Sequence, residues 1–187
     1  MKQILLIIDA QQALLDGNQQ VSPIYKKEQL IKNANKVIKK SKQSDVAVVF
    51  VRDLDVAEGK GNGFHIHSDI HVPTEARFFD KAATNCFYGT GLLEHLKSQD
   101  IEHIVIMGCE TQHCIDSAVR TATINGFDVT LVGDGHSTLG NDVLSAEQMI
   151  AHHNATLHGH YNVDHFSIVR DSEEALFCPT HDSYRLS

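Results

Sequence analysis

The sequence has no long apolar run, no cluster of Lys and Arg, and no cysteine pair at the spacing of metal ligands. Its first apolar run, Ile4–Ile8, meets Asp9 long before a signal-peptide core or a membrane span would be complete. We therefore expect a cytoplasmic protein with no membrane partner. The formal net charge of −8 argues against a nucleic-acid surface, so the expected partners are small molecules.

Disulfide support is not expected either. In a reducing compartment the four cysteines should be free thiols, and they are Cys86, Cys109, Cys114 and Cys178. A chain of 187 residues can bury a substantial core without disulfides, and the sequence shows no internal repeats or low-complexity tracts. We expect one domain over residues 1–187.

Short apolar runs alternate with segments that carry apolar residues at helical spacing. This alternation predicts an α/β fold, with a mostly parallel sheet and helices on both of its faces. Ligands bind at the carboxyl edge of such sheets, and Asp9, Lys81 and Cys114 follow the first, third and fourth runs. The six runs are Met1–Ile8, Val46–Val51, Glu75–Lys81, Ile104–Met107, Asp128–Val132 and Phe166–Val169.

Cys114 falls in the first turn of a predicted helix, inside a strand, helix, strand unit that spans Ile101–Ser137. Free backbone N–H groups and the helix dipole favour a thiolate there, which would lower the pKa of the cysteine and make it a nucleophile. The alternative is a buried small apolar residue. For Asp9 and Lys81 the alternatives are a helix or loop cap and a surface lysine.

Two groups of histidines invite a metal or substrate role. His65, His67 and His71 lie in the glycine-punctuated loop 52–74, whose length indicates a functional or partner-contacting segment. A zinc site needs a defined scaffold and further ligands, so we favour a solvated or substrate-facing loop. His152 and His153 lie on the predicted helix 146–157, where they either reach the site or a subunit interface, or simply pack or face solvent.

Several motifs combine along the chain. They are Ile7-Ile8-Asp9-Ala10-Gln11, then Phe79-Asp80-Lys81 with Cys86-Phe87 and Thr90, then Gly108-Cys109-Glu110-Thr111-Gln112-His113-Cys114-Ile115, then Gly126 and Asp134. From about Lys2 to Val169 the sequence resembles the isochorismatase-like cysteine hydrolase family. The segment 145–154, with Asp134 and His136, is closer to its metal-independent branch, which includes proteins similar to streptothricin hydrolase.

The resemblance implies a three-layer αβα sandwich with a mostly parallel six-stranded sheet, and a catalytic triad that falls on Asp9, Lys81 and Cys114. It also implies a non-proline cis peptide bond between Glu110 and Thr111, and an oxyanion hole made by the N–H groups of Thr111 and Cys114. No metal or cofactor is expected. The candidate substrate contacts are Gln11, Phe87, Glu110 and His113.

The implied reaction is hydrolysis of a carbon–nitrogen bond in a small amide or lactam, through a thioester on Cys114. One alternative is a metal-assisted amidase of the nicotinamidase type, although the Asp-x-His metal pair of those enzymes is replaced here by Asp53-Leu54-Asp55. Another alternative is a non-catalytic binding or assembly member of the fold. The resemblance further implies a homodimer or homotetramer.

Overall fold

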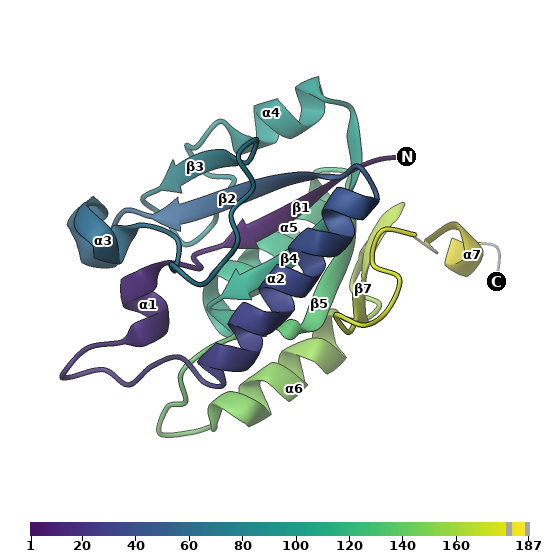
Figure 1. Ribbon diagram of the computed structural model, residues 1–187. Coiled ribbons are helices and arrows are strands. Elements are labelled where there is room, and N and C mark those ends of the chain that lie inside the picture. Colours follow the sequence, from purple (N-terminus) through teal and green to yellow (C-terminus); the bar gives the residue numbers. More distant parts are fainter. Residues whose placement is uncertain (179–180, 186–187) are drawn as a thin grey trace.

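A seven-stranded sheet forms the middle layer of the computed structural model, which describes residues 1–178 and 181–185 (Figure 1). The strand order is β3-β2-β1-β4-β5-β7-β6, and every neighbouring pair is parallel except β6 with β7. The strands are β1 (Lys2–Ile8), β2 (Ala47–Asp53), β3 (Arg77–Lys81), β4 (Ile101–Cys109), β5 (Asp128–Ser137), β6 (Tyr161–Asn162) and β7 (His165–Arg170).

Helices cover both faces of this sheet, with α2 on one face and α5 on the other (Figure 1). The helices are α1 (Gln12–Asp16), α2 (Lys27–Gln43), α3 (Gly61–Phe64), α4 (Leu92–Ser98), α5 (Asp116–Ile124), α6 (Ala146–Leu157) and α7 (His181–Arg185), with short helical turns η1 (Val56–Gly59) and η2 (Thr111–Ile115). The predicted three-layer architecture is therefore confirmed. All six predicted strands are present, and the two-residue antiparallel β6 is an addition too short to show in the sequence pattern.

Strand β1 is apolar throughout because it lies inside the sheet and is covered on both faces. Ile4, Leu6 and Ile8 pack into the layer that contains α4 and α5, whereas Leu5 and Ile7 pack into the layer that contains α2. A strand buried on both sides needs apolar residues at every position. Each fully buried side chain of this kind stabilises the fold by about 1.5–3 kcal/mol.

Local features mark where α6 and α2 begin. Ser145 and Gln148 form a capping box at the start of α6, in which the Gln148 N–H donates to Ser145 Oγ at 3.2 Å. Helix α6 has the predicted bounds. Helix α2 begins at Lys27, because Lys26 has a left-handed φ of 50° and cannot continue a helix toward the N-terminus.

Strands β4 and β5 extend further toward their carboxyl ends than the sequence predicts. Gly108 does not end β4, because a register shift after Ile106 lets the two strands pair again at Gly108 with His136. Gly108 has a φ of +126°, and a Cβ atom there would lie 2.0 Å from the carbonyl oxygen of Ile8. Glycine is required at this position because β1 and β4 approach so closely.

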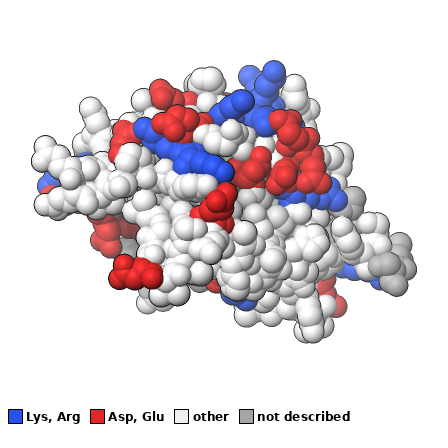
Figure 2. Space-filling view, turned by 90° about the horizontal axis from the view of Figure 1, so that it is seen from below, with Lys and Arg blue, Asp and Glu red and all other residues white. Residues whose placement is uncertain are grey.

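Within the described part of the chain, no helix combines the length and apolarity needed to cross a membrane. On the face seen in Figure 2, the Lys and Arg side chains lie beside Asp and Glu side chains and form no continuous basic area. A broad uncharged region lies between these charged groups.

Candidate active site

Four neighbouring strands each bring one polar side chain to the carboxyl edge of the sheet. In the order β3, β2, β1 and β4, these side chains are Lys81, Asp53, Asp9 and Cys114. Lys81 and Asp53 face each other in the β2–β3 register, and the Asp9 N–H donates to the carbonyl of Val51 on β2 at 2.9 Å. The chain crosses from one side of β1 to the other between β3 and β4, which makes this edge a topological switch point.

The Lys81 ammonium group is the centre of the cluster. Its Nζ lies 3.0 Å from Asp9 Oδ2 and 3.4 Å from Cys114 Sγ, and it also contacts Asp53 Oδ2. These three acceptors match the three N–H donors of an ammonium group. Lys81 is 1% exposed and Asp9 is 2% exposed, so neither the surface-lysine nor the simple-cap interpretation holds.

Burial controls the protonation states in this cluster. It raises the pKa of Asp9 to about 6, although the Lys81 ammonium opposes the shift. Burial, with the nearby Asp9 carboxylate, also raises the pKa of Cys114 to about 12. Burial disfavours the charged form of Lys81, but the Asp9 carboxylate and the bond to Asp53 outweigh it and raise the Lys81 pKa.

The predicted lowering of the Cys114 pKa is therefore wrong. Burial and the Asp9 charge outweigh the helical turn and the Lys81 ammonium, which alone would favour a thiolate. At neutral pH the site holds a thiol, an ammonium group and a largely ionised Asp9. Cys114 thus needs a base to become a nucleophile.

Asp9 lies near enough to be such a base, with a carboxylate oxygen within 4.8 Å of Cys114 Sγ. Its backbone adopts a left-handed φ of 53° at the end of β1, a conformation uncommon for residues other than glycine. Its Oδ1 atom is buried and has no hydrogen-bond partner among the described residues. Buried carboxylate oxygens are usually bonded, so this oxygen is available to accept a proton.

The turn that carries Cys114 is π-helical, because the Ile115 N–H donates to the carbonyl of Glu110 at 3.2 Å. The structure has one non-proline cis peptide bond among its described residues, between Cys109 and Glu110. The predicted position, Glu110–Thr111, is one residue too late. The sequence pattern predicts that the fourth strand ends at Met107, whereas β4 extends to Cys109 and η2 begins at Thr111. The pattern therefore gave no basis for placing the bond between these two elements.

Buried polar residues support this turn from behind. Thr111 Oγ1 lies 2.9 Å from His136 Nδ1, and His136 Nε2 lies 2.8 Å from Asn154 Oδ1. Burial lowers the pKa of His136 to about 4, so its ring is neutral at physiological pH. The oxyanion-hole role of the Thr111 and Cys114 N–H groups stays a prediction.

The predicted substrate contacts occupy different environments. Phe87 is buried in the same apolar cluster as Cys114. Glu110 and His113 lie on the nucleophile turn with Oε2 and Nε2 4.0 Å apart, and the His113 side chain is largely exposed. Contact of these three residues with a substrate stays a prediction.

Gln11 is fully buried, and its side chain hydrogen-bonds to backbone groups of the protein. Its Nε2 donates to the carbonyls of Asp53 at 3.1 Å and Phe64 at 3.0 Å, and its Oε1 accepts from the Asp53 N–H at 2.7 Å. Both N–H donors of the amide are therefore used by the protein itself. The observed role of Gln11 is to hold Asp53, and its predicted substrate contact has no support in this geometry.

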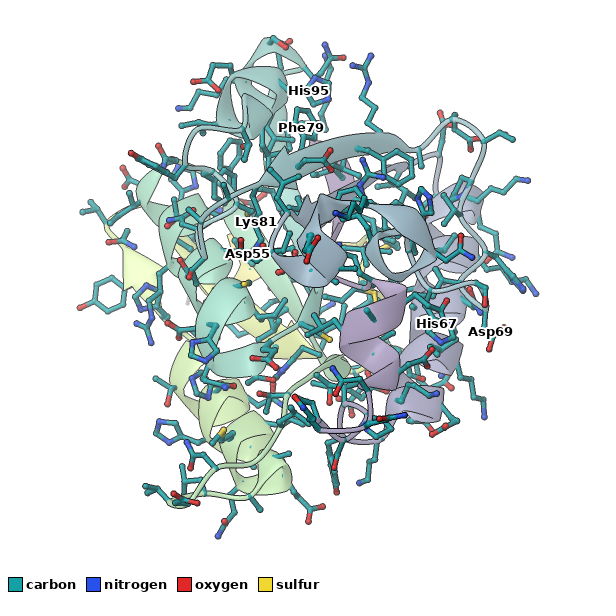
Figure 3. The ribbon with its side chains drawn as sticks, turned by 90° about the vertical axis from the view of Figure 1, so that its left-hand side faces the viewer. Asp55, His67, Asp69, Phe79, Lys81 and His95 are labelled. Atoms are coloured by element: carbon teal, nitrogen blue, oxygen red, sulfur yellow. The ribbon has the colours of Figure 1, made fainter. Side chains whose placement is uncertain are left out.

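The loop histidines do not join the cluster. His67 is buried with its ring 3.2 Å from Asp16 Oδ1, and it lies well apart from Lys81 (Figure 3). His65 and His71 are exposed. On helix α6, His153 Nδ1 bonds the Met149 carbonyl and His152 is exposed.

Asp9, Asp53 and Cys114 form the one group of three potential metal ligands found among the described residues, with ligand atoms within 4.8 Å of one another. The Lys81 ammonium contacts all three. A cation placed among these ligands would meet the positive charge of Lys81. The donor set therefore fits the ammonium group better than a metal ion.

Asp53 is the site residue that the sequence interpretation missed. From the sequence, the segment Asp53-Leu54-Asp55 is interpreted only as an incomplete metal-binding pair. In the structure Asp53 ends β2 just as Lys81 ends β3, but the apolar run predicted for the second strand ends at Val51, so the signal for Asp53 in the sequence was weaker than the signal for Lys81.

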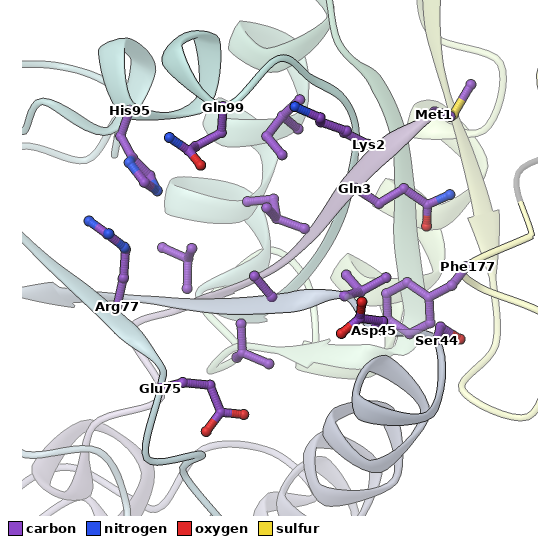
Figure 4. Close-up of a pocket in the computed structure, with 16 residues that line it drawn as sticks. Met1, Lys2, Gln3, Ser44, Asp45, Glu75, Arg77, His95, Gln99 and Phe177 are labelled. Carbon is purple, nitrogen blue, oxygen red and sulfur yellow. The ribbon is translucent and has the colours of Figure 1, made fainter.

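A cavity of about 470 Å³ lies at the opposite end of the strands. Lys2, Asp45, Arg77 and His95 are among the residues that line it (Figure 4). Because these residues precede or begin strands or lie on α4, the cavity is separate from the cluster around Lys81.

In comparison with known proteins, residues 3–164 match the isochorismatase domain. The chain belongs to the isochorismatase family. A relative within that family is YrdC of Bacillus subtilis, which is 27% identical over 194 residues, covering 96% of this chain and 98% of YrdC.

Solved structures share the isochorismatase-like fold. N-carbamoylsarcosine amidase from Thermoplasma acidophilum has a TM-score of 0.72 and 20% identity, with 94% of this chain and 99% of the amidase covered. A cysteine hydrolase from Pseudomonas syringae pv. phaseolicola 1448A has a TM-score of 0.79 and 15% identity, with 92% and 89% covered. The predicted family and fold class are both confirmed.

Proposed function

We propose that this isochorismatase-family protein hydrolyses a carbon–nitrogen bond in a small amide or lactam, with Cys114 as the nucleophile. The observation that carries the proposal is the contact of one buried ammonium group, Lys81 Nζ, with both the Cys114 thiol and the Asp9 carboxylate. A thiol, a nearby base and a residue that orients them are the parts that nucleophilic catalysis requires.

In the first step, Asp9 Oδ1 takes the thiol proton while Cys114 Sγ forms a bond to the carbonyl carbon. The carbonyl π electrons move to oxygen, and the N–H groups of Thr111 and Cys114 are the proposed donors to that oxyanion. Protonated Asp9 then gives its proton to the departing nitrogen as the carbon–nitrogen bond breaks. The product is a thioester on Cys114, with a free amine or ammonia released from an amide, or with the amine still attached to the acyl group when a lactam ring opens.

In the second step, water attacks the thioester while Asp9 accepts one of its protons. The carbon–sulfur bond breaks, the sulfur recovers a proton from Asp9, and the carboxylic acid leaves. Lys81 keeps its charge throughout and stabilises the ionised forms of Asp9 and Cys114. An Asp9 pKa of about 6 suits both roles, because the group is ionised at neutral pH but can still carry a proton.

The similarity in fold to N-carbamoylsarcosine amidase supports carbon–nitrogen bonds as the substrate class to test first. The metal-assisted alternative is less favoured because Lys81 contacts the donors that would hold the ion. The non-catalytic alternative is less favoured because nucleophile, base and lysine are all present and in contact.

The test is a screen of the purified protein for ammonia release from primary amides and ureas, and for ring opening of lactams to the corresponding amino acids. Wild type and Cys178→Ala should both be active on the substrate that is found, because Cys178 is exposed and lies outside the cluster. Cys114→Ala should lose the activity. Turnover by folded Cys114→Ala at the wild-type rate would exclude the thioester mechanism.

A further inference from the structure

Asp53 gives the cluster one more negative charge than a triad needs. Lys81 Nζ contacts both Asp9 Oδ2 and Asp53 Oδ2, so two carboxylates share one ammonium group. With the thiol protonated, the three charged groups carry a net charge of −1. The Asp53 side chain is 19% exposed, whereas the Asp9 side chain is 3% exposed.

The Asp53 carboxylate is held in a defined place. Gln11 bonds both the N–H and the carbonyl of Asp53, and the Asp55 N–H donates to Asp53 Oδ1 at 2.9 Å. The following residue, Leu54, donates its N–H to the Lys81 carbonyl at 2.9 Å. The fully buried Gln11 side chain thus fixes the backbone of Asp53, which contacts Lys81. An ordinary surface ion pair is not held in place in this way.

We propose that Asp53 is a positioning residue that shares the Lys81 ammonium group with Asp9 and thereby keeps the Asp9 carboxyl able to take and return a proton near neutral pH. The role of Asp53 in catalysis rests on the proposed function. Its effect on the ionisation of Asp9 can be tested without a substrate.

The physical reason is competition for one cation. If Asp53 were neutral, Lys81 would direct its whole charge at Asp9 and Cys114, and a nearby negative charge would be lost as well. Both changes favour the ionised form of Asp9. Asp9 would then be a weaker base toward the thiol. Its protonated form, which donates to the leaving nitrogen, would also be less populated.

Few other groups can titrate next to Asp9. Lys81 faces it from β3, Asp53 from β2 and Cys114 from η2. Cys86 and Cys109 are buried close by, and burial raises the pKa of each thiol, so both stay neutral over the relevant range. The charge of Asp53 is therefore the variable that a single substitution can change.

The experiment follows the ionisation of the Asp9 carboxyl carbon by NMR in isotope-labelled protein, with the resonance assigned from Asp9→Asn. In wild type the midpoint should lie at about 6. In Asp53→Asn it should fall by about one pH unit or more, as expected for removal of a neighbouring charge. Asp53→Glu keeps the charge and should stay within about half a unit of wild type.

Asp55→Asn is the matched control, because Asp55 is exposed, lies two residues away and has no ion pair among the described residues. It removes the same charge but should leave the Asp9 midpoint unchanged, since solvent screens exposed charges. An unchanged or higher Asp9 midpoint in folded Asp53→Asn would overturn the inference. If Asp53→Asn does not fold, Asp53→Ser provides the same test.

The kinetic readout separates this inference from the proposed function. On a substrate that wild type hydrolyses, the acidic limb of kcat/KM should move to lower pH in Asp53→Asn by the same amount as the NMR midpoint. A limb that stays in place while the NMR midpoint moves would overturn the catalytic part of the inference. If the protein hydrolyses no amide, the proposed function fails, and the NMR shift still decides the role of the Asp53 charge.

Discussion

Thr111 Oγ1 lies 2.9 Å from His136 Nδ1, and this contact ties the nucleophile turn to the end of β5. Asn154 Nδ2 donates to the Gly133 carbonyl at 3.0 Å, so Asn154 Oδ1 accepts from His136 Nε2. The other ring nitrogen, Nδ1, is then an acceptor for the Thr111 hydroxyl. The chain of bonds fixes one tautomer of a neutral, buried histidine.

Thr111→Val should therefore destabilise the protein while preserving the shape of the side chain. The substitution leaves His136 Nδ1 buried without a donor, which costs about 1–3 kcal/mol of the free energy of unfolding. Urea denaturation measures this loss. Thr156→Val on the exposed face of α6 is the control and should change stability by less than about 0.5 kcal/mol. Equal stabilities for the two variants would contradict the assigned bond.

The stability of the protein should depend on pH through His136. Its folded pKa of about 4 lies below the ordinary value of 6.5, so the unfolded chain binds more protons between these values. Its contribution to stability is therefore present above pH 6.5 and is lost as the pH falls to about 4. Over this window, wild type should lose about 3 kcal/mol relative to His136→Gln.

The measurement is the difference in unfolding free energy between wild type and His136→Gln at a series of pH values. Asp9 acts in the opposite direction, because its folded pKa of about 6 exceeds its ordinary 3.8. Taking the difference between two proteins that both contain Asp9 cancels that contribution. A difference that does not vary with pH would show that His136 titrates normally in the folded state.

The rate of hydrolysis should rise with pH through the titration of Asp9. The ionised carboxylate is the form that accepts the thiol proton, so kcat/KM should increase as the pH rises and should reach half of its plateau at about 6. A pH series with the substrate identified in the screen checks this. A limb at the ordinary aspartate pKa of 3.8 would show that burial does not perturb this group.

Asp9→Asn should change hydrolysis and thiol reactivity in opposite directions. Hydrolysis should fall by about 10²–10⁴-fold, because asparagine cannot carry the proton. Alkylation of Cys114 by iodoacetamide should become several-fold faster at mildly alkaline pH, because removing the Asp9 charge lowers the pKa of the thiol.

Peptide mass spectrometry after brief labelling measures the alkylation. The exposed Cys178 in the same sample is the internal standard and should react at the same rate in both proteins. If Cys114 reacted more slowly in the variant, Asp9 would be assisting thiolate formation in the resting protein, and the repulsive effect assigned to its charge would be incorrect.

The sequence pattern was sufficient to predict the layers of the fold and three of the four clustered side chains. Asp9, Lys81 and Cys114 each follow an apolar run, and parallel strands bring such positions to one edge. The second predicted run ends at Val51 and is followed by Arg52, whereas β2 extends to Asp53, so the same rule does not single out Asp53. The family resemblance relates Asp53 to a metal-binding pair, and only the folded structure shows its contact with Lys81.

The sequence by itself determined which residues reach the carboxyl edge of the sheet, because strand period and chain order depend on local patterns of apolar side chains. Tertiary structure decided what those residues are chemically. Desolvation depends on all the atoms that surround a group, so only the folded protein shows that Cys114 is a protonated thiol, that Asp9 titrates at about 6, and that Lys81 is shared with Asp53.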